Sequence, residues 1–425
     1  MAEDNRNIRP NYTIGITMGD LDFSNNLETI NILSSILAPY QTVQVTFRAD
    51  AGSILLEDIL GGKDIELNIE FMGDDETPKE SILLKLITIG IQIPVDMTEN
   101  DGSDQAGRQL FSMVCFIKEP FEFMTTTVNK LFDDSKSLQP IQMVEELISL
   151  FTPSMNTEIK TEGQNEEIIT QFVVPPMKMV DAIRYMDATD KETIRRFGSG
   201  IGLYKGPTFF QCKFEDNTFV MWNLAKEMES APAYTIYHLA KGADDTELMR
   251  NSGVDGSAYY IRGTIDASFR GNLDIIQNSY ITKFLSKPID TFTEWKELNM
   301  DTVFEESAVH DGGQLLVNES VKKRLEYRTI GEIGYETSEA MYYSRLAKRI
   351  SSMSSISFTI DRNLFLTPLA RVGVSIELKP QAAEYADLQG KYIVNSTNIT
   401  LNRQSSDVWI GAVKINAFRG NLKKL

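Results

Sequence analysis

The sequence predicts a mainly β protein with a mixed α and β part in its middle. Strand patterns fill the first 118 residues and the last part of the chain, residues 351–425, and helix patterns lie between them. A strand with one buried face alternates apolar and polar residues, whereas a helix repeats its apolar residues every three or four positions. We therefore expect two antiparallel β-barrel domains that flank a mixed α+β domain.

Alternating residues define the strands of the first β part. Val43, Val45 and Phe47, for example, alternate with polar neighbours. A short helix is expected between these strands at residues 53–60, because it begins after a serine and ends at a glycine pair. The expected strands cover residues 29–36, 43–47, 65–71, 87–93 and 111–117.

The pattern changes near Pro120. Apolar residues in 141–151 follow helical spacing, with Pro140 at a position where the first helical turn tolerates proline. A second helix is expected through residues 179–186, opened by Pro175 and Pro176. A flexible glycine-rich connector, residues 198–206, then leads to a hairpin and a helix at residues 224–228.

Strand patterns return in the second half. An acidic, weakly patterned segment at residues 287–318 is expected to form loops, and residues 337–351 are expected to form a helix. The domain boundaries follow these changes: residues 1–118, 119–230, 231–350 and 351–425. The expected strands cover residues 234–239, 259–269, 356–360, 372–378, 392–395, 399–402 and 408–418.

Composition excludes several classes of function. The net charge of −18 argues against a protein that grips nucleic acid, because phosphate contacts need clustered Lys and Arg. It is compatible with a channel along which DNA slides, because an acidic wall repels phosphate. The polar N-terminus and the lack of a long apolar stretch predict a soluble protein, made in the cytoplasm and without a membrane segment.

No catalytic, cofactor-binding or metal-binding residue is predicted. His238 and His310 are the two histidines of the chain, which are few for a zinc site or a catalytic triad. Cys115 and Cys212 lie in apolar, alternating runs and are expected to be buried free thiols. The spacing G-x-G-x-G at residues 198–202 lacks the strand-to-helix context of a dinucleotide site. No cofactor is therefore expected.

The order of these pieces resembles baseplate hub proteins of contractile-tailed bacteriophages. The resemblance begins at residues 20–24 and 31–40, and continues through residues 54–71. The Pro175-Pro176 pair with its helix and the hairpin into Leu224 fit the second domain of that family. Residues 363–374 and 390–394 fit its end. Residues 287–314 depart from the family pattern, so no functional element is placed there.

The resemblance implies a structural protein of the virion and not an enzyme. Its two tail-tube-like barrels per chain would give a homotrimer six barrels, in a ring that joins a three-fold central spike to a six-fold tail tube. The implied partners are the spike and tube or tube-initiator proteins, with baseplate wedge proteins as further candidates. The resemblance also implies that DNA passes the channel without specific binding. The alternatives are another tube-end adaptor or initiator, a tail-associated hydrolase, and a β binding module outside any virus.

The contacts between subunits are predicted at strand edges. Long, one-sided strands near the ends of both expected barrels could pair with neighbouring chains. The predicted interaction residues are Ile65, Leu67, Ile69, Phe71, Val372, Val374, Ile376 and Leu378. A short repeat, at residues 269–273 and 418–422, could mark barrels of related construction or arise by chance.

Overall fold

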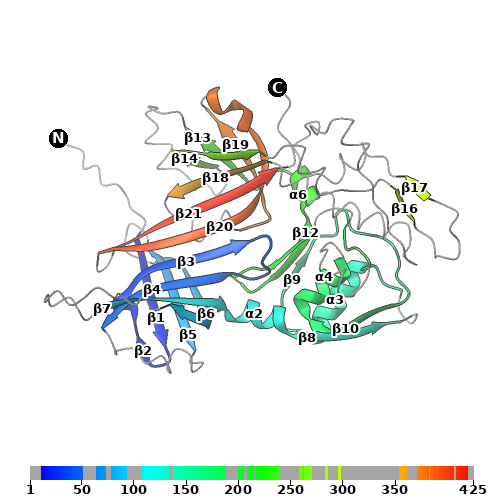
Figure 1. Cartoon of the computed structure of the whole chain (residues 1–425), viewed down its shortest axis with the longest axis horizontal. Coiled ribbons are helices and arrows are strands. Elements are labelled where there is room, and N and C mark those ends of the chain that lie inside the picture. Colours follow the sequence, from blue (N-terminus) through cyan, green and yellow to red (C-terminus); the bar gives the residue numbers. More distant parts are fainter. Residues whose placement is uncertain are drawn as a thin grey trace.

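A computed structural model shows the architecture (Figure 1). The residues that it describes are 11–50, 64–72, 78–92, 108–133, 137–187, 200–204, 208–214, 216–239, 258–261, 263–269, 283–285, 295–297, 354–361, 371–381, 383–405 and 408–419. Most of these residues lie in strands, as the sequence predicts. The expected helices at residues 53–60 and 337–351 lie outside the described residues, as does His310.

The first β region consists of antiparallel strands in the order β3-β4-β7-β6-β5-β1-β2. Buried and more exposed residues alternate along these strands. In β4, for example, Val43, Val45 and Phe47 are buried, and the residues between them are more exposed. The expected strands are confirmed, and β1 is an addition. The bounds are β1 (Asn11–Met18), β2 (Leu21–Asp22), η1 (Ser24–Asn26), β3 (Leu27–Ser35), β4 (Thr42–Asp50), β5 (Ile65–Met72), β6 (Pro78–Gln92) and β7 (Arg108–Ile117).

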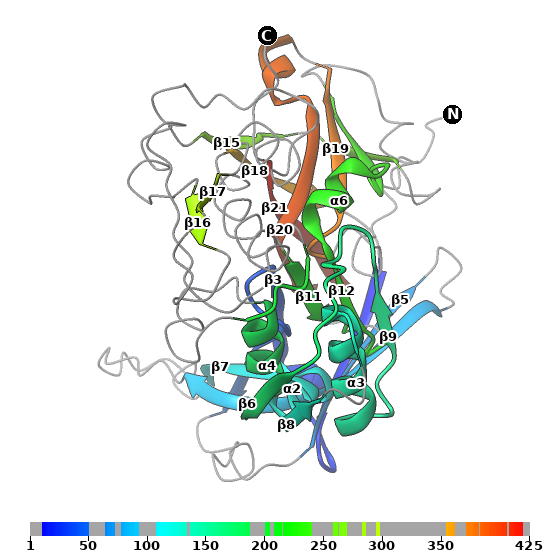
Figure 2. The same ribbon diagram turned by 90° about the vertical axis from the view of Figure 1, so that its right-hand side faces the viewer.

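The middle region packs its helices beside the first β region (Figure 2). The helix expected at 141–151 is confirmed; the Gln142 side chain accepts a hydrogen bond from the Gln139 N–H, 2.9 Å away, at its start. The bounds are α2 (Lys118–Thr125), β8 (Thr127–Phe132), α3 (Pro140–Phe151), β9 (Thr157–Ile159), β10 (Phe172–Lys178), α4 (Met179–Asp187), β11 (Thr208–Cys212), β12 (Phe219–Asn223) and α6 (Leu224–Glu229).

One detail of the middle region corrects the prediction. Pro175 and Pro176 do not open the second helix but lie within β10, and α4 begins at Met179. The pairing of β10 with β8 shifts register between Val174 and Met177, because proline has no N–H to donate to the ladder. The prolines therefore mark a β-bulge and not the first turn of a helix.

The second β region combines strands that are distant in the sequence. β13 pairs in parallel with both β14 and β19, and the remaining pairs are antiparallel. The two strands expected at 392–395 and 399–402 form one long strand, β20, with a bulge between Val394 and Ser396 in its pairing with β21. The bounds are β13 (Tyr234–His238), β14 (Ala258–Ile261), β15 (Asp266–Phe269), β18 (Ser354–Asp361), β19 (Ser375–Pro380), η4 (Ala383–Leu388), β20 (Gly390–Ser405) and β21 (Val408–Arg419).

A separate two-stranded ladder pairs β16 (Lys283–Leu285) with β17 (Trp295–Glu297). β17 lies within residues 287–318, where loops were expected, and β16 precedes them. Among the described residues, no helix is long and apolar enough to cross a membrane.

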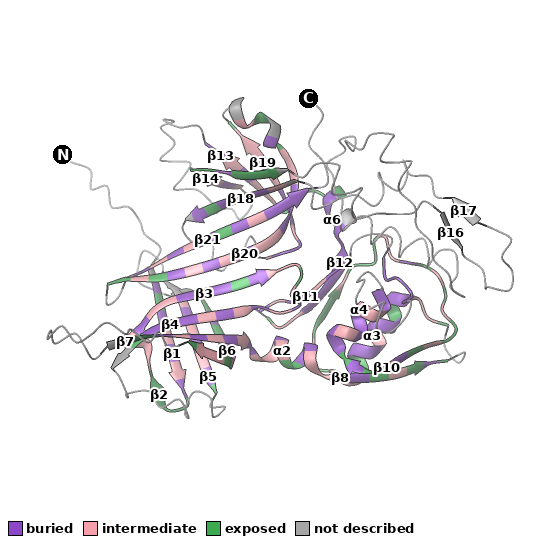
Figure 3. Ribbon diagram, in the orientation of Figure 1, coloured by how far each residue is buried: buried purple, intermediate pink, exposed green. Residues whose placement is uncertain are grey.

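The two β regions form one continuous sheet. β3 of the first region pairs with β20 of the second, so that 14 strands belong to the same hydrogen-bonded network. One hydrophobic core runs under both regions and takes in Phe209, Trp222 and Leu224 from the middle region. A second core fills the middle region between α3, α4 and the β8–β10 ribbon. Figure 3 shows buried positions alternating with more exposed ones along β3, β4, β20 and β21.

Candidate functional site

The predicted interaction residues do not lie on free sheet edges. β5, with Ile65, Leu67, Ile69 and Phe71, pairs with β1 on one side and β6 on the other. β19, with Ile376 and Leu378, likewise lies between β13 and β20, and Val372 and Val374 precede it. The premise of free edges is wrong because both backbone sides are already hydrogen-bonded within the chain. The prediction that these segments contact a neighbouring subunit remains untested.

The reactive side chains of the described residues are held in structural settings. His238 is buried, with its Nε2 2.7 Å from the Gly263 carbonyl oxygen and its ring edge-on to Tyr385. Burial raises the pKa of the Cys115 thiol to about 12 and also raises that of Cys212. Thiols in this state are poor nucleophiles at neutral pH. No cluster of potential metal ligands occurs among the described residues.

The predicted flexible connector is packed where the structure describes it. Residues 200–204 are buried, and the N–H groups of Ile201 and Gly202 both donate to the Met186 carbonyl at 2.9 Å. The buried Asn165 amide donates to the carbonyls of the same two residues, at 2.9 and 3.2 Å. The described part of this segment is therefore fixed against the middle region.

The most informative site is the junction of the three regions. The β regions meet through backbone pairing of β3 with β20, which runs from Ser35 opposite Ser396 to Thr29 opposite Asn402. Side chains reinforce this joint: the Thr400 hydroxyl donates to Asn31 Oδ1 at 2.8 Å, and the Thr29 hydroxyl donates to Asn402 Oδ1 at 3.1 Å. The contact between the β regions therefore combines a backbone ladder and cross-strand side-chain bonds with the shared hydrophobic core beneath them.

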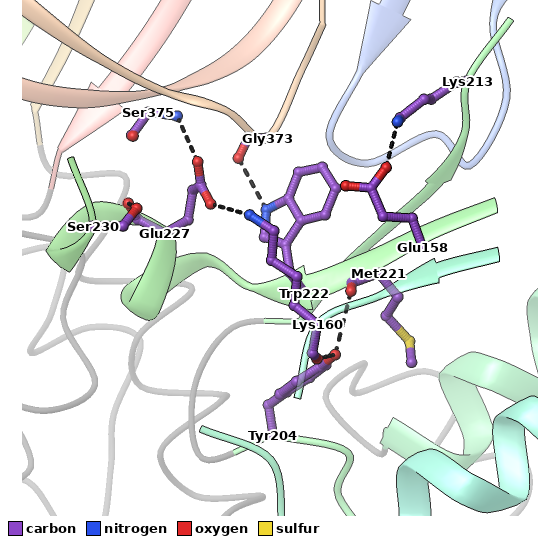
Figure 4. A network of polar contacts seen from close by, with 10 residues as sticks. All are labelled: Glu158, Lys160, Tyr204, Lys213, Met221, Trp222, Glu227, Ser230, Gly373 and Ser375. Carbon is purple, nitrogen blue, oxygen red and sulfur yellow. Dashed lines mark hydrogen bonds and ion pairs between the residues drawn. The ribbon is translucent and has the colours of Figure 1, made fainter. Parts of the chain in front are cut away.

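The middle region meets the second β region through side chains. Trp222 of β12 donates its indole N–H to the Gly373 carbonyl at 3.1 Å, in a buried position (Figure 4). Lys160 Nζ lies 5.1 Å from the centre of the Trp222 ring and 2.9 Å from Glu227 Oε2. Glu227, on α6, also approaches the Ser375 N–H at 3.4 Å. We call this group of Lys160, Trp222, Glu227, Gly373 and Ser375 the latch.

Gly373 is required at its place in the latch. Its φ of +81° lies in the left-handed region, and a Cβ built there would be 2.8 Å from the ring of Phe209. Both facts exclude a larger residue without strain. The sequence interpretation treated 372–378 as one strand and missed this turn, although a glycine inside a strand pattern can signal a close backbone approach.

The middle region also bonds to the first β region. The Gln41 side chain donates to the Cys212 carbonyl at 2.9 Å, and the Cys212 N–H donates to the Pro39 carbonyl at 3.0 Å. A small pocket lies at this three-way junction, lined by Ser34 and Gln41, by Phe209 and Trp222, and by Arg371. The junction therefore holds the three regions of the chain together through side-chain hydrogen bonds, packing and backbone ladders.

The architecture is similar to that of tail proteins of known structure. Two solved structures share it over nearly their whole length. The tail protein from Neisseria meningitidis MC58 matches with a TM-score of 0.54 at 11% identity, covering 96% of this chain and 97% of that one. The 43 kDa tail protein of prophage MuSo2 from Shewanella oneidensis matches with a TM-score of 0.54 at 8% identity, covering 96% and 98%.

The predicted resemblance is thereby confirmed at the level of the fold. No family model matches the sequence, and no curated protein sequence matches it.

Proposed function

We propose that this chain is the central hub of a phage tail baseplate. Three copies form a ring that joins the tail tube to the central spike. Each chain supplies two barrel-like domains, built from the first and second β regions, so the trimer presents six such domains around one channel. A three-fold assembly then offers a pseudo-six-fold surface to a six-fold tube.

The observation that carries this proposal is the continuous sheet across β3 and β20. It holds two β regions side by side as a rigid pair within one chain. A ring of alternating domains needs such a fixed angle between its two domains, because an error at each joint would prevent closure. The match to two tail proteins over 96% of the chain supports a place in the tail.

The role is structural and not enzymatic in this proposal. The fold neighbours are named as tail proteins, and His238 and both thiols are held in buried, structural settings. The proposed partners are the spike below and the tube or tube-initiator proteins above, with wedge proteins as further candidates. DNA passes the channel without specific binding, and the protein is a component of the virion baseplate that assembles in the host cytoplasm.

The contacts between subunits need surfaces other than the backbone edges of β5 and β19. Among the described strands, the ends of the sheet order are β14, β15 and β2, each paired on one side. Terminal strands are the natural places for a neighbouring chain to add to a sheet. The segments around residues 65–71 and 372–378 stay candidates for side-chain contacts.

Native mass tests this function. Light scattering across a concentration series is expected to give a discrete species of three times 47.9 kDa, and electron microscopy is expected to show a ring with six lobes. A chain that stays monomeric at every concentration and with its spike protein present would refute the hub. That result would favour a tube-end adaptor instead. Release of sugars from purified cell wall or capsule would favour the hydrolase.

A further inference from the structure

Two buried polar residues interrupt the apolar pattern of β3 and β4. Alternate residues of these strands face the core, and in the inner rows Ile32 lies opposite Val43. The next inward step of the same register places Ser34 opposite Gln41, which directly precedes β4. Both are buried, with exposed fractions of 4% and 1%. A hydroxyl and an amide therefore stand where the pattern would place two apolar side chains.

The polar atoms of this pair are only partly bonded to protein. Gln41 Nε2 donates to the Cys212 carbonyl at 2.9 Å, and this bond fixes the orientation of the amide, because a carbonyl oxygen can only accept. Gln41 Oε1 and Ser34 Oγ are buried and have no hydrogen-bond partner among the described residues. Buried polar atoms of folded proteins are paired with protein groups or with ordered water. Two such atoms on facing residues therefore indicate a bound group.

Both residues line the small cavity at the junction of the three regions. The cavity measures about 20 Å³, and its further walls include the rings of Phe209 and Trp222 and the Arg371 side chain. The indole N–H of Trp222 is already bonded to the Gly373 carbonyl (Figure 4). A cavity needs about 10–15 Å³ to admit one water molecule. The size therefore suits a single water and excludes a larger ligand.

The charges around the cavity favour a neutral occupant. The ionisable residues in its described lining are Lys213 and Arg371, and two basic groups disfavour a bound metal cation. Lys213 Nζ is already paired with the Glu158 carboxylate (Figure 4), and the Gln41 Oε1 lone pairs repel an anion. A water molecule can donate to Gln41 Oε1 and form a second bond with the Ser34 hydroxyl, which both donates and accepts.

We propose that one structural water occupies this cavity, bound by Ser34 Oγ and Gln41 Oε1. It completes the hydrogen bonding of the inner rows of β3 and β4 at the point where the first β region meets the middle region. The Ser34 hydroxyl is then a stabilising group, because it helps to bind the water. This inference concerns a site within one chain, so it depends neither on the proposed hub function nor on the number of subunits.

A crystal structure of the native protein, at a resolution that shows ordered water, tests the occupant. One density peak is expected within hydrogen-bonding distance of both Ser34 Oγ and Gln41 Oε1. The peak should weaken in Ser34→Ala, which removes one of its two partners. A direct bond between the two side chains without a peak would overturn the inference. Xenon entering the cavity of native crystals under pressure would also overturn it, because xenon binds in dry, apolar cavities.

Urea unfolding tests the role of the hydroxyl, with Ser375→Ala as the matched control for Ser34→Ala. Ser375 is also buried and its hydroxyl has no partner among the described residues, but it does not line the cavity. Loss of an unpaired buried hydroxyl should not destabilise the protein, whereas loss of a water-bound hydroxyl should.

Ser34→Ala is therefore expected to lower the urea midpoint, with an unfolding equilibrium constant that rises about five-fold. Ser375→Ala is expected to unfold at the native midpoint or above it. A Ser34→Ala variant that is no less stable than Ser375→Ala would show that the Ser34 hydroxyl binds nothing, and the proposed water site would be wrong.

Discussion

Two contacts join the regions of this molecule, the β3–β20 joint and the latch, and they consist of different interactions. The β3–β20 joint between the β regions consists of a backbone ladder, which any residue except proline can supply. The latch between the middle region and the second β region depends on individual side chains and on one glycine. The outward positions of the first joint, which lie outside the shared hydrophobic core, should therefore tolerate substitution, and the second joint should not.

Among substitutions in the latch, the largest loss of stability is expected at Gly373. Gly373→Ala introduces a Cβ that meets the Phe209 ring at 2.8 Å and forces alanine into a φ of +81°. Backbone strain and overpacking together are expected to lower the free energy of unfolding by about 2–4 kcal/mol. Urea unfolding measures this change.

Gly90→Ala is the matched control, because nothing lies within 4 Å of a Cβ built at Gly90 and its φ is not in the left-handed region. The control is expected to unfold like the native protein. A Gly373 variant as stable as the Gly90 variant would show that the turn at Gly373 adapts freely, and the latch would lose its most specific member.

A smaller effect is expected at Trp222. Trp222→Phe keeps an aromatic ring but removes the indole N–H that bonds the buried Gly373 carbonyl. An unsatisfied buried acceptor costs about 1–3 kcal/mol. Hydrogen exchange is expected to show faster opening of β12 and α6 than in the native protein, with β3 and β20 unchanged. Equal acceleration in β3 and β20 would mean that the two joints act as one unit.

The smallest effect is expected at the backbone joint. Asn31→Ala removes the acceptor of the Thr400 hydroxyl bond but leaves the β3–β20 ladder in place. Because the side chains there are only partly buried, the free energy of unfolding should fall by about 0.5 kcal/mol. A loss as large as that of Trp222→Phe, measured in the same urea series, would show that the outward side chains of this joint contribute as much as the latch.

Local patterns in the sequence predicted most of the strands and the long helix α3. They did so because alternation and helical spacing depend only on which face of an element is buried. The error at Pro175 and Pro176 has a similar local origin. Proline opens helices and also marks bulges, and only the neighbouring strand β8 decides between these roles.

The joints could not be predicted in the same way. Nothing in the sequence near Thr29 indicates a partner at Asn402, and nothing near Trp222 indicates Gly373. The premise that these strands have free edges failed for the same reason. A one-sided strand such as residues 65–71 looks the same in sequence whether it lies at the edge of a sheet or between β1 and β6.

The sequence by itself thus determined the β character, the mixed middle part and the net acidity of the chain, because composition and periodicity are local properties of the chain. Only the tertiary structure decided which strands meet, and therefore that the two β regions share one sheet. Many distant segments have a similar strand pattern and could pair with one another. Packing of the whole molecule selects which of them do.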